Sequence, residues 1–254
     1  MRVRTSRTIL IVLACVFLGG MVLLALAGDR SARRELPAQL AAWTTVGLVV
    51  FAGWWFKVRP RRELHRDEAR SLRLESASGD VFGFLDRPFA LLREPATAKD
   101  VENTSWGTWR GRDVTVFDYW LARSSDPSRD DYEYFSCAAT PVPADWPDLS
   151  IVPSRGPGWV ADVIHGESIG FELERFNRAF DVRCVDGRFA HALVDARMIE
   201  WLLGLPAGTG FEISGGTLLA RLPRPTWDDV AASLETMGAF LDRIPPVVAS
   251  VFGR

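Results

Sequence analysis

The chain has 254 residues, of which 48% are hydrophobic and 24% charged, and its formal net charge at pH 7 is −2. Residues 1–70 contain 12 Lys/Arg and 5 Asp/Glu (+7), whereas residues 71–254 contain 18 and 27 (−9). The acidic part lacks the Lys/Arg surface that a phosphate backbone requires, which excludes nucleic acid as the expected partner. The three cysteines and three histidines do not have the spacing of a zinc site or a disulfide framework, so we expect no metal and no cofactor.

Two apolar runs near the N-terminus predict membrane spans. Residues 8–27, TILIVLACVFLGGMVLLALA, contain no charge, and a helix of that length crosses a hydrocarbon core of about 30 Å. Residues 40–56, LAAWTTVGLVVFAGWWF, are at the short end of the spanning range, but tryptophans lie near both ends, where interfacial aromatic residues belong. We therefore expect residues 1–70 to form a membrane anchor built on a transmembrane helical hairpin.

The basic residues around these runs predict the orientation of the chain. Arginines precede the first run, and a basic segment, residues 57–70, follows the second. By the positive-inside rule, both the N-terminus and the C-terminal domain are cytoplasmic, as in a multi-pass protein of the plasma membrane. The expected partners are the lipid bilayer and another membrane protein, because the runs contain glycines that suit helix packing (Gly19, Gly20, Gly47, Gly53).

Three alternatives apply to the N-terminal region. The sequence ALA before Gly28 fits a signal peptidase site, but the apolar run is longer than a typical signal peptide core. A lipoprotein site at Cys15 would divide the first helix, so we disfavour it. Residues 57–70 are interpreted as a topology anchor rather than a sensor of anionic lipids, because acidic residues interrupt the basic ones.

From residue 71 onward, the pattern predicts one cytosolic α+β domain with a mixed, mainly antiparallel sheet and a C-terminal amphipathic helix. Residues 82–95 are expected to dock as a turn and short helix. The segment WGTWRGRDVTVFDYW, residues 106–120, predicts a hairpin whose two-residue turn is Gly111-Arg112.

The predicted hairpin register places Trp106 and Trp109 on opposite faces and Trp106 opposite Phe117. It also places Ser105 opposite Asp118, the one charge within the strand. Because a buried carboxylate requires donors, we expect Ser105 or another nearby donor to bind Asp118.

The remaining elements follow from turn and periodicity signals. Strands are expected at 132–140 and around Ile151, and hairpins at the turns Asp186-Gly187 and Gly215-Gly216. Helices are expected at 168–180 with Ser168 as N-cap, and after Asp195. The final helix follows a capping pattern at Thr226 and ends at Pro245-Pro246, with a buried stripe at Val230, Leu234, Met237, Leu241 and Ile244.

The sequence GESIG at 166–170 matches the G-x-S-x-G nucleophile elbow of serine hydrolases. In that fold an acid and a histidine must follow the serine, and here the only later histidine, His191, comes 23 residues after Ser168. No strand, crossover helix and next strand fit in that interval, so a hydrolase is not expected. The histidine alternates with apolar neighbours, which is typical of a structural role.

Three segments carry a family resemblance: residues 106–120, ESIGFELERFNRAFDVRC and RFAHALVDARMIEWLL. Together they resemble bacterial, especially actinobacterial, membrane proteins of unknown function with two N-terminal spans and one cytosolic domain. The resemblance implies no activity and no catalytic residues. It makes Asn177 and Arg178 candidates for a polar structural network or, second, for a ligand site.

The sequence thus predicts a membrane-anchored cytosolic binding or scaffold domain, residues 71–254, with an unidentified ligand. An enzyme is the first alternative, and an accessory subunit of a membrane complex is the second. The candidate binding residues are Asp118, Asn177, Arg178 and His191. If they converge in one pocket, the enzyme hypothesis gains support, and if they are dispersed it should be dropped.

Overall fold

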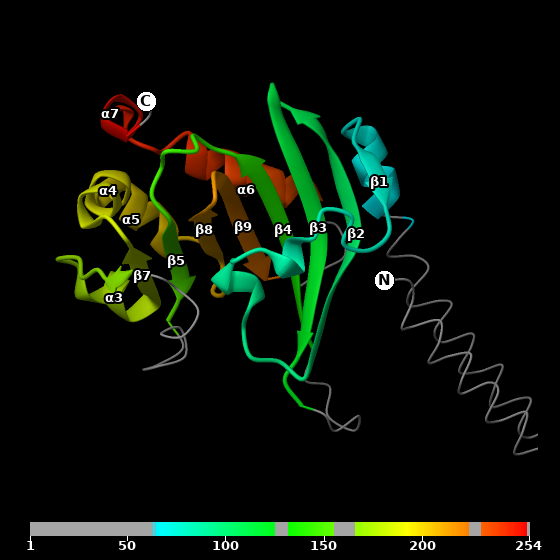
Figure 1. Cartoon of the computed structure of the whole chain (residues 1–254), viewed down its shortest axis with the longest axis horizontal. Helices are drawn as coiled ribbons and strands as arrows, with labels where there is room; N and C mark the ends of the chain where they lie inside the picture. Colours follow the sequence, from blue (N-terminus) through cyan, green and yellow to red (C-terminus); the bar gives the residue numbers. More distant parts are fainter. Residues whose placement is uncertain (1–62, 64, 125–131, 155–165, 224–229, 253–254) are drawn as a thin grey trace, which may run out of the picture. The chain divides into compact units, whose positions relative to one another are not determined.

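The computed structural model describes residues 63, 65–124, 132–154, 166–223 and 230–252 (Figure 1). The chain divides into two units, Met1–Arg61 and Arg62–Arg254, and all described residues belong to the second. The predicted spans at 8–27 and 40–56 lie outside the described residues. Within the described part, no helix is both long and apolar enough to cross a bilayer.

One antiparallel sheet organises the second unit. Among the described residues it has nine strands in the order β1-β2-β3-β4-β9-β8-β5-β7-β6, and every neighbouring pair is antiparallel. The strands are β1 (Glu75–Ala77), β2 (Ala98–Trp109), β3 (Arg112–Ala122), β4 (Tyr132–Pro141), β5 (Leu149–Pro153), β6 (Glu167–Ser168), β7 (Phe180–Cys184), β8 (Gly210–Ser214) and β9 (Thr217–Pro223). The predicted α+β class and the strands at 132–140 and Ile151 are therefore confirmed.

Both faces of the sheet are buried, because alternate residues of the central strands belong to different hydrophobic clusters. Phe117 and Tyr119 of β3 pack under the short 3-10 turns η1 (Phe84–Asp86) and η2 (Ala90–Leu92), which cross one face (Figure 1). Val114 and Val116 belong to the cluster on the other face, which helix α6 (Val230–Leu241) covers. The expected docking of residues 82–95 is thus confirmed.

Four further helices gather beside β5 and β7 (Figure 1). They are α3 (Glu174–Ala179), α4 (Gly187–Leu193), α5 (Ala196–Leu203) and α7 (Pro246–Phe252). A helix at residues 65–71 precedes β1, and its Ala69 is fully buried in the cluster on the α6 side. Its Glu68 carboxylate accepts hydrogen bonds from the first backbone N–H groups of α6, at Val230 and Ala231. This negative charge stabilises the N-terminus of α6.

The hairpin of β2 and β3 forms with a different turn from the predicted one. Trp109 pairs with Arg112, so the turn is Arg110-Gly111, and both turn residues have positive φ (49° and 76°). That geometry matches a type I′ turn, whereas the prediction assumed glycine in the first position. Arg110 tolerates the left-handed backbone because its guanidinium stacks on Trp109 and pairs with Glu235 of α6 at 2.6 Å.

The corrected register shifts the pairing by two residues and so keeps each side chain on its predicted face. Trp106 lies opposite Thr115 rather than Phe117, and Ser105 lies opposite Val116 rather than Asp118. Trp109 packs against Gly238 of α6, and the Trp106 ring contacts Phe82, 5.4 Å away. The placement of the two tryptophans on opposite faces is therefore confirmed, and both are half-buried; Trp109 packs on the cluster on the α6 side, whereas Trp106 lies outside both hydrophobic clusters.

Two predicted elements between residues 168 and 194 are wrong. Ser168 lies in β6 instead of capping a helix, and α3 begins only at Glu174. Asp186 does not form a hairpin turn but caps α4, accepting a hydrogen bond from the Arg188 N–H at 2.8 Å. The apolar pattern of the segment RFAHAL fits both the two-residue period of a strand and the 3.6-residue period of a helix. The segment forms a helix because that conformation buries Phe189, Ala190 and Leu193 together.

Three other predictions are confirmed. Asp195 caps α5 by accepting from the Met198 N–H, and β8 and β9 form the hairpin that turns at Gly215-Gly216. The expected stripe is buried at Val230, Leu234 and Met237 of α6, and half-buried at Leu241, its last residue, and at Ile244. The predicted end of this helix is wrong, because α6 ends at Leu241 and Pro246 begins α7 instead of ending the final helix. The expected cap at Thr226 lies outside the described residues.

Candidate functional site

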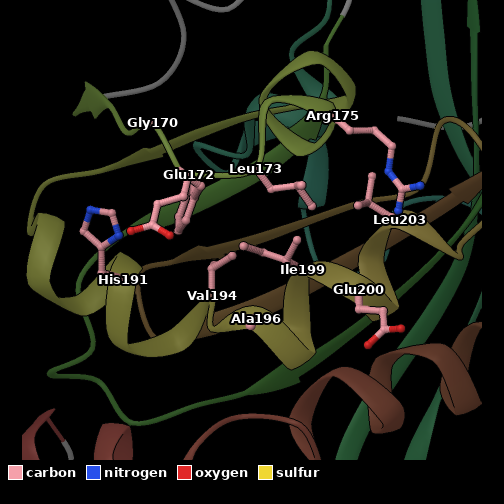
Figure 2. A pocket seen from close by; sticks show the side chains of 11 residues that line it. Gly170, Glu172, Leu173, Arg175, His191, Val194, Ala196, Ile199, Glu200 and Leu203 are labelled. Atoms are coloured by element: carbon pink, nitrogen blue, oxygen red, sulfur yellow. The ribbon is translucent and has the colours of Figure 1, made fainter.

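A cleft of about 540 Å³ lies between α5 and the segment that leads into α3 (Figure 2). One wall consists of residues 170–173 and Arg175, and the other of His191, Val194 and α5. From α5 the lining residues are Ala196, Ile199, Glu200 and Leu203, which have the i, i+3, i+4, i+7 spacing of one helical face. A cleft of this size is in the usual range for small-molecule sites.

The interior of the cleft is apolar and its rim is charged. Val194 is buried, and Phe171, Ile199 and Leu203 are half-buried. The four lining side chains that carry charge or titrate are all exposed: Glu172, Arg175, His191 and Glu200. An occupant would therefore place its apolar part inside and its polar part at the rim.

Asn177 fixes the wall opposite α5. Its side-chain amide accepts a hydrogen bond from the Phe171 N–H at 2.9 Å and donates one to the Phe171 carbonyl at 2.6 Å. The amide thus satisfies both backbone groups of Phe171, as a neighbouring strand would. Because the ring of Phe171 also packs on Phe176, whose side chain is fully buried, the wall is anchored to the core and the cleft is preformed.

Of the four predicted site residues, His191 lines the cleft, Asn177 lies outside the lining and holds the Phe171 wall, and Arg178 and Asp118 contribute to neither. The His191 ring lies 5.0 Å from that of Phe171, and in Figure 2 it lies on the same side as Glu172. Arg178 is exposed outside the lining and lies 3.7 Å from Glu174. Asp118 lies in β3, part of a different cluster. The four side chains are dispersed, so they do not support the enzyme hypothesis.

Asp118 belongs to a buried polar cluster that joins the helix at 65–71 to the sheet. Its Oδ2 accepts a hydrogen bond from the Asn103 amide at 2.6 Å, and its Oδ1 lies 3.9 Å from Nδ1 of His65. Nε2 of His65 lies 2.9 Å from Oγ of Ser105. The expected nearby donor to Asp118 is therefore Asn103, while Ser105 binds the histidine.

This serine, histidine and aspartate have the order of a catalytic triad, but their burial argues against catalysis. The Ser105 side chain is fully buried and His65 is 1% exposed, so a substrate has no access to the hydroxyl. Asn103 reaches Asp118 because β2 bulges there, where its pairing with β3 shifts between Glu102 and Ser105. Asn103 itself has φ of 49°, a conformation that asparagine tolerates well. The cluster is structural.

A second buried polar cluster lies on the other face of the sheet, under η2. Arg221 of β9 is fully buried, donates to the Leu91 carbonyl at 2.6 Å and lies 2.5 Å from the Glu94 carboxylate. Glu212 of β8 accepts from the N–H groups of Ala90 and Leu91. These contacts hold the segment that covers this face of the sheet. Burial raises the pKa of Glu212 to about 7, although both hydrogen bonds and Arg221 oppose the shift.

The structure places Ser168 of the GESIG motif away from any elbow between a strand and a helix. Its hydroxyl lies 3.2 Å from a carboxylate oxygen of Asp181 on the adjacent strand. Within the residues that the structure describes, no group of His, Cys, Asp and Glu side chains is arranged to hold a metal ion. Cys137 and Cys184 are buried free thiols, and burial raises the pKa of each.

Sequence reasoning missed most of the cleft. Arg175, Ile199 and Leu203 were not singled out, because apolar residues at helical spacing usually indicate a core face. On α5 the fully buried residues are Met198 and Leu202, while Ile199 and Leu203 lie one position further round and line the cleft. The sequence signal was that the pair Ile199 and Leu203 directly follows the pair Met198 and Leu202, so that the apolar face of α5 is wider than its fully buried stripe.

Comparisons with known proteins give a structural similarity but no family. No protein-family model matches the chain, and no curated protein matches it. The crystal structure of the mycobacterial trehalose monomycolate transport factor A, TtfA, is similar with a TM-score of 0.49 and 14% sequence identity, over 74% of this chain and 97% of that one.

Proposed function

We propose that this chain is a membrane-anchored binding domain and that the cleft beside α5 is its ligand site. The observation that carries the proposal is a preformed apolar cleft with a charged rim, which is the usual construction of a binding site. The two hydrogen bonds by which the Asn177 amide clamps the backbone of Phe171 support the proposal, because a wall that is already ordered loses less entropy when a ligand binds.

The membrane part of the proposal rests on the sequence. An uncharged run of twenty residues at 8–27 and the basic residues around both runs favour an anchor with the domain on the cytoplasmic side. A scaffold role at the inner face of the plasma membrane follows if the occupant of the cleft belongs to a partner molecule.

Site-specific photocrosslinking of the full chain in its native membrane tests the proposal. A photoreactive benzoylphenylalanine replaces Leu173, which is 44% exposed on the wall of the cleft, or, as a control, Val251, which is 54% exposed on α7 outside the lining. We expect a light-dependent adduct from position 173 but not from 251, and we expect Ile199→Asp to abolish it. An absence of adducts from position 173, or equal adducts from both positions, would contradict a ligand site at this cleft.

A further inference from the structure

The cleft offers a ligand apolar contact but few hydrogen-bonding groups in its interior. The residues within it are Phe171, Val194, Ile199 and Leu203, and the backbone N–H and C=O of Phe171 are already bound by Asn177. An extended peptide would bring its own N–H and C=O groups into this interior without partners, and burying them unpaired is unfavourable. An alkyl chain brings no such groups and only gains from burial.

The volume suits a single chain. About 540 Å³ holds roughly 18 groups of the size of a water molecule, at ~30 Å³ each, and a methylene group is of similar size. A saturated chain of about 12 to 16 carbons therefore fits, whereas two such chains do not.

The rim supplies one cation that is available for a headgroup. Arg175 is exposed and, within the described part of the chain, makes no ion pair, while Arg178 on the same helix lies 3.7 Å from Glu174. Figure 2 shows the Arg175 side chain extending toward Leu203, which also lines the cleft. A guanidinium in this position can bind a carboxylate through two parallel hydrogen bonds.

The acidic residues of the rim limit the charge of that headgroup. Glu172 and Glu200 both line the cleft and are exposed. They repel a doubly charged phosphate monoester more strongly than a singly charged carboxylate.

We propose that the cleft binds a single-chain amphiphile with a carboxylate headgroup, of the fatty-acid type, with the chain against α5 and the carboxylate on Arg175. This inference rests on the proposed function and specifies its ligand. It is also consistent with the predicted anchor, since a bilayer concentrates amphiphiles beside the domain.

Photolabelling of the full chain in phosphatidylcholine nanodiscs tests this inference. The probe is hexadecanoate with a diazirine in mid-chain, and the two comparison probes carry the same chain with an alcohol or a trimethylammonium headgroup. We expect hexadecanoate adducts within residues 170–175 and 194–203, and competition by unlabelled hexadecanoate. We expect Arg175→Gln to reduce labelling by hexadecanoate about threefold to fivefold, the effect of one exposed ion pair, and to leave labelling by the alcohol unchanged.

Arg178→Gln is the matched control, because it removes the same charge from the same helix outside the cleft. It should leave all labelling unchanged. The inference is overturned if hexadecanoate labels neither wall, if the trimethylammonium probe labels the cleft as well as hexadecanoate does, or if Arg175→Gln has no effect. Should position 173 trap a protein partner while hexadecanoate fails to label, the proposed function stands and this inference fails.

Discussion

Glu212 shows how a single buried carboxylate links the stability of this domain to pH. Its side chain is on β8, where the residue is 5% exposed, and its oxygens accept from the N–H groups of Ala90 and Leu91 at 2.8 and 3.0 Å. Burial raises its pKa from 4.5 to about 7. Folding therefore takes up a proton between these two pH values.

The sign of the pH dependence follows from that uptake. The folded state binds more protons than the unfolded state, so the contribution of Glu212 to stability is greatest below pH 4.5 and is lost as the pH rises through about 7. A shift of this size corresponds to about 3 kcal/mol in the free energy of unfolding. We expect Glu212→Gln to flatten the pH dependence of urea unfolding between pH 4.5 and 7.5.

The control for this experiment is Glu200→Gln, which makes the same chemical change on the exposed face of α5. It should leave the slope intact. An unchanged slope in Glu212→Gln would show that the carboxylate titrates normally in the folded protein.

The buried side chain of Arg221 is the basis of a second prediction about a single residue. Its side chain is fully buried, it lies 2.5 Å from Glu94 and over the ring of Phe135, and its Nε and Nη2 lack hydrogen-bond partners within the described residues. Arg221→Met leaves the Glu94 carboxylate buried without its fully buried partner, while Arg123 still lies 2.8 Å away. We expect a loss of about 3 kcal/mol in the free energy of unfolding, measured in urea.

A double-mutant cycle with Glu94→Leu separates the ion pair from packing. Because the apolar pair removes both buried charges, Arg221→Met/Glu94→Leu should be less destabilised than the sum of the single variants. Strict additivity would mean that the two side chains act independently, contrary to the geometry.

Among the elements, the wall formed by residues 170–173 depends on one side chain of α3. Asn177→Ala removes both hydrogen bonds to Phe171, each worth about 1 kcal/mol. We expect faster hydrogen exchange of the Phe171 amide and its neighbours, with no change in the amides of α6. Arg178→Ala, an exposed neighbour on the same helix, is the control, and equal effects of the two substitutions would exclude a specific clamp.

The elements also show which features the sequence could predict. Asp195, the glycine pair at 215–216 and the stripe from Val230 to Met237 act through neighbours within a few residues, and these predictions were right. The hairpin turn was misplaced because its stability depends on Glu235, which is distant in sequence and pairs with Arg110. The turn type follows from that tertiary contact and from the stacking on Trp109.

The site was harder to predict than the fold because it, too, depends on contacts between residues that are distant in sequence. His191 was found as a titratable residue, and Asn177 was found within the resembled segment, but neither pattern shows that they meet at one cleft. A cleft forms where neighbouring elements do not fill the space between them, and here that depends on how α3, α4 and α5 pack together. Ile199 and Leu203 are apolar like core residues, and they are half-buried only because no other element covers them fully.

At the scale of the whole molecule, the basic residues that flank the two apolar runs predict the side of the membrane on which the domain lies. Replacing Lys57, Arg59, Arg61 and Arg62 with glutamine removes most of the positive charge that follows the second apolar run. In intact spheroplasts treated with external protease, we expect the wild-type domain to be protected and to become digestible only after permeabilisation. The four-residue variant should lose part of that protection, because most of the positive charge that holds the segment after the second run on the cytoplasmic side is gone, while the arginines before the first run remain.

Replacing Arg188 and Arg197, two exposed arginines within the described domain, by glutamine is the control for altered protease sites. Digestion of the wild-type domain in intact spheroplasts would place the cleft outside the cell and contradict the predicted topology.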